Sequence, residues 1–229
     1  MKISLAILFF LFAFIKSEAK TAMTNQSFQV GNPELKEHFI DSSTIGRKKL
    51  NKIELSLYNN EDSNYVIIKF YSKTSGKSWK LKQIFSFEKD GVTSLDTKLS
   101  DFNNDGLKDM TYISAVAARG ANEVRRLFIY DKTKDEIILM KNSEEYPNML
   151  YNKQLNCIDA FLVHGGSSTI FLKIYGDSLR EFAGVDLDNS LTVYTVDKNG
   201  KQKIIRKDKT TQWNYVRFKN YNPLIPYDK

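Results

Sequence analysis

The sequence has little cysteine, little histidine and no second long apolar run, and each shortage excludes a class of protein. Cys157 is the single cysteine of the 229 residues, so no disulfide can form within the chain. The fold must therefore depend on packing, with help from a metal where one binds. A free cysteine of this kind is expected in the core, where it packs as a small hydrophobic side chain.

The one long apolar run is at the N-terminus. Residues 3–15 are apolar apart from Ser4, Lys2 precedes them, and Ser17-Glu18-Ala19 follows with small residues suited to cleavage. The run is shorter than the ~20 residues needed to span a bilayer, and nothing comparable comes later in the chain. The sequence predicts a signal peptide over residues 1–19, an exported (periplasmic or secreted) protein, and no transmembrane anchor.

Basic residues exceed acidic ones, 34 to 27, which gives a formal net charge of +7. The excess is spread along the chain, with short clusters at residues 47–49, 125–126 and 201–209. None of these clusters is interleaved with aromatic residues as in a nucleic-acid-binding pattern, so we expect no nucleic-acid partner. Such clusters are typical of solvated strand faces and turns, or of a surface attracted to an acidic partner.

Short β-rich runs alternate with polar turns along most of the chain. Alternation of apolar and polar residues is the period of a half-buried strand, and Asn199-Gly200 marks a tight hairpin turn. The predicted strands cover residues 52–59, 65–71, 79–87, 111–116, 127–130, 136–140, 157–163, 169–175, 179–185, 191–196 and 202–206. Residues 33–40 are the exception, because Asn32 as cap and Pro33 at the first helical position predict two helical turns.

This pattern predicts a mostly β fold, an antiparallel β-sandwich or an irregular barrel with one calcium loop between strands. Residues 20–95 would form an N-terminal β region and residues 96–229 a calcium-loop β domain. The alternative is that the two regions form a single domain.

Residues 101–109 carry the most specific motif, with the spacing D-x-[DN]-x-D-G-x-x-D. Oxygen atoms at alternate positions can converge on one cation when the chain curls, and Gly106 permits the bend. The predicted ligands are the side chains of Asp101, Asn103, Asp105 and Asp109 and the carbonyl of Leu107.

An all-oxygen set favours calcium, with magnesium second, and disfavours zinc and copper. The loop is not an EF-hand, because Tyr112 occupies the position of the bidentate glutamate. The alternative is an ordinary polar turn, since Asn, Asp and Gly dominate turns without any metal. We expect the site to stabilise the fold rather than to catalyse.

Gly176-Asp177-Ser178-Leu179 spells the nucleophile motif of the GDSL esterases. In that family the catalytic histidine lies downstream of the serine, whereas His38 and His164 both precede Ser178. A hairpin turn explains Gly-Asp between two strand-like runs. The sequence therefore predicts a protein without enzymatic activity.

The motif and the landmarks after it resemble a known bacterial group. After residues 101–110 come Arg119-Gly120-Ala121-Asn122, a strand that ends in Tyr130-Asp131-Lys132-Thr133, Tyr146-Pro147-Asn148, Gly165-Gly166-Ser167, and a hairpin at residues 174–179. This order resembles the periplasmic calcium-loop proteins that include an immunity protein against lysozyme-like effectors of a bacterial type IV secretion system. The loop alone also resembles the FG-GAP repeats of integrin-type propellers, but it occurs once, without their repeat.

The resemblance implies a protein that binds and blocks a lysozyme-like peptidoglycan hydrolase by placing a loop in a cleft built around two carboxylates. The loops expected to do so contain Arg119, Gly120 and Asn122 in one, and His164 and Ser167 in the other. The alternative is a β domain that binds glycan or envelope through exposed aromatic residues such as Trp79 and Trp213, although buried positions are more usual for tryptophan.

Overall fold

The computed structural model describes residues 33–60, 63–73, 78–91, 93–209 and 215–227. The predicted signal peptide, residues 1–19, and Trp213 lie outside these ranges. The described residues all belong to one compact unit.

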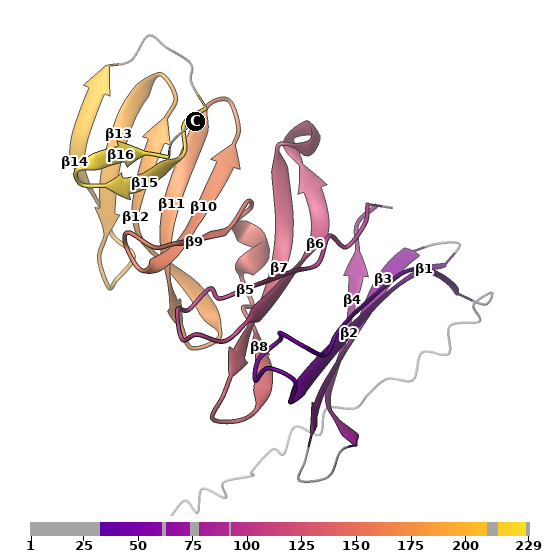
Figure 1. Cartoon of the computed structure of the whole chain (residues 1–229). Coiled ribbons are helices and arrows are strands. Elements are labelled where there is room, and N and C mark those ends of the chain that lie inside the picture. The colour runs from indigo at the N-terminus through magenta and orange to yellow at the C-terminus, as the bar shows by residue number, and fades with distance from the viewer. Residues whose placement is uncertain (1–32, 61–62, 74–77, 92, 210–214, 228–229) are drawn as a thin grey trace, which may run out of the picture. The chain divides into compact units, whose positions relative to one another are not determined.

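The described residues form four antiparallel sheets, each built from strands that follow one another in the chain (Figure 1). The first sheet contains β1 (Glu34–Asp41), β2 (Asn51–Asn60), β3 (Ser63–Lys73) and β4 (Trp79–Lys89). The second sheet contains β5 (Lys98–Ser100), β6 (Asp109–Ala117), β7 (Asn122–Asp131) and β8 (Glu136–Leu139). Two 3-10 turns, η1 (Ala118–Gly120) and η2 (Ser143–Glu145), follow β6 and β8.

The third sheet has six strands, and the fourth is a two-stranded C-terminal hairpin. The third sheet contains β9 (Leu150–Asn152), β10 (Cys157–Val163), β11 (Ser167–Tyr175), β12 (Ser178–Leu187), β13 (Ser190–Val196) and β14 (Gln202–Lys209). The hairpin contains β15 (Phe218–Tyr221) and β16 (Leu224–Pro226).

Three apolar cores separate these layers. The first lies between the first and second sheets and is built from Ile53, Leu55, Ile68, Phe70, Met110, Tyr112, Phe128 and Tyr130, among others. The second joins the second and third sheets through Leu127, Ile129, Ile158, Ala160 and Leu172. The third joins the third sheet to the hairpin through Phe171, Ala183, Val193 and Phe218.

The second sheet is buried on both faces, because β7 supplies alternate side chains to two cores. Phe128 and Tyr130 belong to the first core, whereas Leu127 and Ile129 belong to the second. This follows from the two-residue period of a strand, whose successive side chains point to opposite faces. The prediction of a mostly β, sandwich-like antiparallel fold is confirmed, and all four sheets are open layers.

The predicted helix over residues 33–40 is wrong. Glu34–Asp41 form the strand β1 instead, which pairs with β2 from Glu34↔Asn59 to Asp41↔Ile53. The pairing places Phe39 against the first core, while Ile40 stays 54% exposed on the other face. Capping signals are local, and here the hydrogen bonds offered by a neighbouring strand outweigh them.

The first core contains residues from both sides of residue 95, the boundary of the predicted N-terminal β region. Ile53 and Phe70 precede that boundary, and Met110 and Phe128 follow it. Cys157 lies buried in the third core, as expected, and burial raises the pKa of its thiol to about 12. The described part of the chain contains no helix long and apolar enough to cross a membrane.

Candidate functional site

The motif of residues 101–109 forms the connection between β5 and β6, and its side chains fold back on the loop's own backbone. Asp101 accepts hydrogen bonds from the amide of Asp105 at 3.2 Å and from that of Gly106 at 2.9 Å. Asp105 accepts one from the amide of Leu107 at 2.8 Å, and its other oxygen lies 3.1 Å from Nδ2 of Asn103. Gly106 has φ +84°, a conformation that glycine adopts without strain.

Asp109, the last residue of the motif, is buried between the loop and β7. Its side chain is fully buried, and its two oxygens accept hydrogen bonds from the amides of Phe102 at 2.7 Å and Tyr130 at 2.9 Å. Burial raises the pKa of Asp109 to about 7, and the charges of Asp105 and Asp101 add to the rise. The carboxylate therefore joins the loop to β7, a contact that sequence spacing does not reveal.

These residues carry the oxygen ligands that a hard cation such as calcium prefers. The side chains of Asp101, Asn103 and Asp105 line one loop, and a carboxylate oxygen that accepts one hydrogen bond keeps a second lone pair. A divalent cation would offset the repulsion among Asp101, Asp105 and Asp109. The described residues contain no group of three or more His, Cys, Asp or Glu side chains gathered to hold a metal.

The loop is also fixed to the first sheet. The amide of Gly46 donates to the carbonyl of Lys108 at 2.9 Å, and Leu107 packs against the first core. Asp41, at the end of β1, orders the segment that reaches this contact by accepting hydrogen bonds from the amides of Thr44 and Ile45. The motif thus connects β5, β6, β7 and the end of the first sheet.

The predicted partner-binding residues Arg119, Gly120 and Asn122 lie at the opposite end of β6, in its hairpin with β7. Residues 116–121 are all exposed. Ala118 and Arg119 have φ +49° and +55°, the left-handed region that non-glycine residues rarely occupy. Strained backbone of this kind is concentrated at functional sites.

The second predicted loop connects β10 to β11. His164 is exposed, its Nδ1 accepts a hydrogen bond from the amide of Gly166, and its Nε2 lies 3.0 Å from the Ser168 hydroxyl. A Cβ on Gly166 would lie 2.2 Å from the carbonyl oxygen of Leu187, so glycine is required there. Ser167 is fully buried, which leaves His164 as the side chain that this loop presents to a partner.

Asn122 joins the two loops, although they belong to different sheets. Its side chain donates to the carbonyl of Val163 and accepts from the amide of Val163, both at 2.9 Å. Asn148 supports the same junction, because its amide group bonds the carbonyls of Ala121 and Phe161. The structure therefore brings Arg119 and His164 to one side of the molecule, as the sequence could not show.

A groove of about 430 Å³ lies beside these elements, between the edge strands β5 and β9. Two arginines line it, and the sequence predicted neither as a site residue. Arg125 is bound to Asp96 and Glu123, and Arg217 to Asp159. Because carboxylates already neutralise both guanidinium groups, the groove is not a ready-made site for an anion.

Buried Asp159 was also missed, and no feature of its neighbourhood in the sequence marks it. It lies inside β10 and accepts hydrogen bonds from Asn152, Arg217 and Tyr227. These contacts hold the C-terminal hairpin region against the third sheet. Its function is therefore structural.

No family model matches the chain, and no curated protein matches it. A solved structure described as a Xanthomonas type IV secretion system related protein is similar over 77% of this chain and 98% of that chain, with 10% sequence identity and a TM-score of 0.46.

Proposed function

We propose that this protein is an exported, calcium-binding and non-catalytic inhibitor, whose target is a lysozyme-like peptidoglycan hydrolase. The observation that carries the proposal is the junction of the Arg119 hairpin and the His164 loop through Asn122 and Val163. Two exposed loops held together by side-chain hydrogen bonds make a pre-organised surface, which reduces the entropy lost on binding.

Arg119 suits the cleft of such an enzyme. It stands at the tip of a hairpin whose neighbours, residues 116–118 and 120–121, are small or aliphatic and exposed. Within the described part of the chain, no carboxylate forms an ion pair with Arg119. Glycosidases of this type carry a pair of carboxylates in the cleft, and a guanidinium group can bind a carboxylate through two hydrogen bonds.

The calcium loop would support this surface from a distance. β6 begins at Asp109, the end of the motif, and leads directly to the exposed hairpin. A cation bound by Asp101, Asn103, Asp105, the carbonyl of Leu107 and Asp109 would supply positive charge where carboxylates repel each other. The ion would thereby hold the start of β6 in place, away from the target.

Inhibition of a panel of lysozymes tests the first part of the proposal. Arg119→Ala and His164→Ala are expected to weaken inhibition, with Arg119→Ala costing about tenfold or more, as removal of a central interface arginine usually does. Arg180→Ala and His38→Ala are matched controls, because both residues lie on other elements, β12 and β1. Equal inhibition by all four variants, or inhibition of no lysozyme by the wild type, would refute the target.

Thermal unfolding with and without calcium tests the second part. Calcium should raise the melting temperature and chelator should lower it, since a ligand that binds only the folded state stabilises that state. Asp101→Ala should abolish the response to calcium. A melting temperature that millimolar calcium leaves unchanged would refute the metal site. The proposal that the protein inhibits a lysozyme would not be affected by that result.

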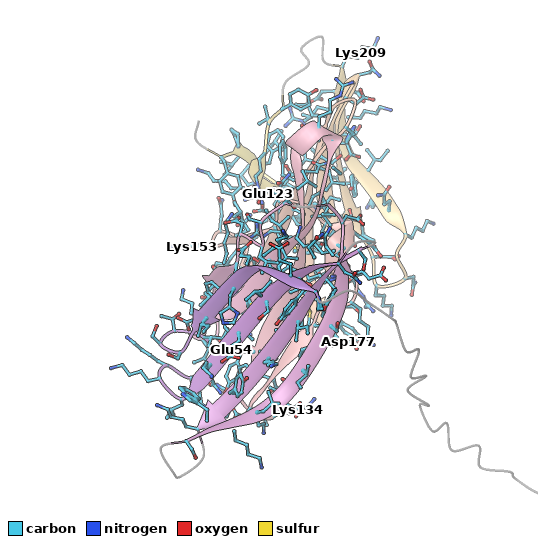
Figure 2. The ribbon with its side chains drawn as sticks, turned by 90° about the vertical axis from the view of Figure 1, so that its right-hand side faces the viewer. Glu54, Glu123, Lys134, Lys153, Asp177 and Lys209 are labelled. Atoms are coloured by element: carbon cyan, nitrogen blue, oxygen red, sulfur yellow. The ribbon has the colours of Figure 1, made fainter. Side chains whose placement is uncertain are left out.

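A second candidate function is supported by the outer face of the first sheet, on which Glu54 is labelled (Figure 2). Trp79 is half-buried on this face and lies beneath Lys73, whose Nζ is 4.5 Å from its ring. Tyr58 and Tyr65 stack with centroids 5.3 Å apart. Aromatic rings on an open sheet face, beside charged groups such as Glu54, are suited to a polysaccharide.

Co-sedimentation with insoluble peptidoglycan separates this candidate from the first. Trp79→Ala should weaken binding if the face holds glycan, whereas Tyr175→Ala, which removes an aromatic side chain 66% exposed on β11, should not. No binding by the wild type would eliminate the candidate.

A further inference from the structure

Strand β14 carries a basic surface that neither proposed function uses. Residues 201–209 contain five basic side chains and one acidic one, a net charge of +4 within a chain of net charge +7. The basic residues are Lys201, Lys203, Arg206, Lys207 and Lys209. β14 together with Lys201, the residue before it, therefore carries more than half of the excess charge of the protein.

The position of β14 leaves this charge open to a partner. β14 is the last strand of the third sheet and pairs with β13 on one side. All its residues are exposed except the half-buried Asp208, and none belongs to the three apolar cores. In Figure 1 it forms an outer border of the third sheet. The strand is anchored by its backbone and contributes no side chain to a core.

Two isoleucines interrupt the basic residues. Ile204 is 57% exposed and Ile205 is 42% exposed. The pairing register shifts between Val193 and Tyr194 of β13, and Ile205 is the residue left without a partner there. Because a bulge breaks the alternation of the strand, two neighbouring aliphatic side chains are presented to solvent together.

Protection of a sheet edge accounts for the lysines but not for the isoleucines. Lysine on an edge strand discourages pairing with another chain, and an exposed aliphatic pair has the opposite effect. The ion pair of this strand is Arg206–Asp208, and within the described residues no carboxylate pairs with Lys203 or Lys207. Two unneutralised lysines flank the isoleucines, an arrangement that requires another explanation.

We propose that β14 binds an anionic phospholipid surface. The lysines contact the headgroups, and Ile204 and Ile205 enter the boundary between headgroups and acyl chains. Basic residues combined with exposed aliphatic ones are typical of interfacial membrane binding. A second copy of this strand is disfavoured as the occupant, because it would bring like charges together.

Co-sedimentation of the purified protein with vesicles tests the proposal. Wild-type protein should bind vesicles of equal parts phosphatidylglycerol and phosphatidylcholine and should not bind pure phosphatidylcholine. Lys203→Gln with Lys207→Gln should lower the partition coefficient about 30-fold, because each basic residue near an anionic surface contributes about fivefold. Raising the salt from about 50 mM to about 500 mM should release the protein, since the Debye length shortens.

The matched control is a variant with the same net charge as the Lys203→Gln, Lys207→Gln double variant. Lys48→Gln with Lys49→Gln removes the same charge from an exposed turn between β1 and β2 and should bind as the wild type does. Ile204→Ser with Ile205→Ser should weaken binding while the charge is intact. Equal binding by the two glutamine double variants, binding to pure phosphatidylcholine, or binding to polyglutamate but not to vesicles would overturn the proposal. Lysozyme inhibition is measured separately, so either proposal can fail alone.

Discussion

The carboxylate of Asp109 stabilises two backbone amides in a place that water does not reach. If it is removed, the amides of Phe102 and Tyr130 lose their acceptor while still buried. We predict that Asp109→Ala lowers the free energy of unfolding by about 2–4 kcal/mol even in chelator, because each unsatisfied buried group costs about 1–3 kcal/mol. Urea unfolding measures this loss.

Asp101→Ala is the control for that experiment, because the hydrogen bonds of Asp101 are confined to the exposed loop. In chelator it should cost less than about 1 kcal/mol, as surface substitutions usually do. Equal losses for the two variants in chelator would contradict a structural role for Asp109 beyond the metal.

Glu181 gives the protein a pH dependence with a defined sign. Burial raises the pKa of Glu181 above its usual 4.5, the charge of Asp186 adds to the rise, and the hydroxyl of Tyr194 opposes it by donating a hydrogen bond at 2.7 Å. The carboxyl group of Glu181 therefore keeps its proton to a higher pH in the folded state than in the unfolded state. This residue's contribution to stability is full below the unfolded pKa and is lost as pH rises through the folded pKa.

Glu181→Gln keeps an acceptor for Tyr194 and removes the charge. We predict that this variant melts at a higher temperature than the wild type at neutral pH, and that the difference shrinks to nothing as pH falls below 4.5, the usual pKa of a glutamate. Melting curves across that range measure the effect. A difference that grows on acidification would show that the sign is wrong.

At the scale of elements, the junction between the Arg119 hairpin and the His164 loop depends on one side chain. Asn122→Ala removes both hydrogen bonds to Val163. We predict a loss of about 1–3 kcal/mol in stability, the cost of leaving partly buried polar groups unpaired. Hydrogen exchange at the amide of Val163 should accelerate, and inhibition of the target lysozyme should weaken because the two loops are no longer held together.

The strands show which elements a sequence can predict. β2 follows its alternation of apolar and polar residues and is buried at every second position from Asn51 to Leu57. The Gly176-Asp177 turn lies between Tyr175 and Ser178, which pair as the ends of β11 and β12, as predicted. Both signals are local. The periodicity indicates which face of the strand packs against the core, and the turn residues are those that can adopt the backbone angles of the turn.

The wrong and missing elements depend on partners that are distant in the sequence. β1 is a strand because β2 lies beside it, and the Asn32-Pro33 capping signal does not depend on that neighbouring strand. The spacing of the motif placed Asp109 among its oxygens, but its bond to the amide of Tyr130 crosses 21 residues. The Asn122–Val163 junction crosses 41. Contacts of this kind come from topology, which no residue pattern in a single sequence encodes.

At the scale of the whole molecule, β7 couples the layers. Adjacent residues Leu127 and Phe128, both fully buried, belong to different cores. If the second core opened, the strand that carries Phe128 would lose its support, and the first core would lose one of its largest side chains. The layers are therefore expected to unfold together, in one cooperative transition.

A substitution in one layer and a reporter in another test this coupling. Leu172, on β11 in the second core, is fully buried, and Leu172→Ala should cost about 2–5 kcal/mol. Trp79, on β4 of the first sheet, is the reporter once Trp213→Phe has removed the other tryptophan. We predict that Leu172→Ala shifts the urea midpoint of Trp79 fluorescence as far as it shifts that of far-ultraviolet circular dichroism. A Trp79 midpoint that stays in place would mean that the first sheet unfolds independently, because β7 would then not transmit the loss between its two faces.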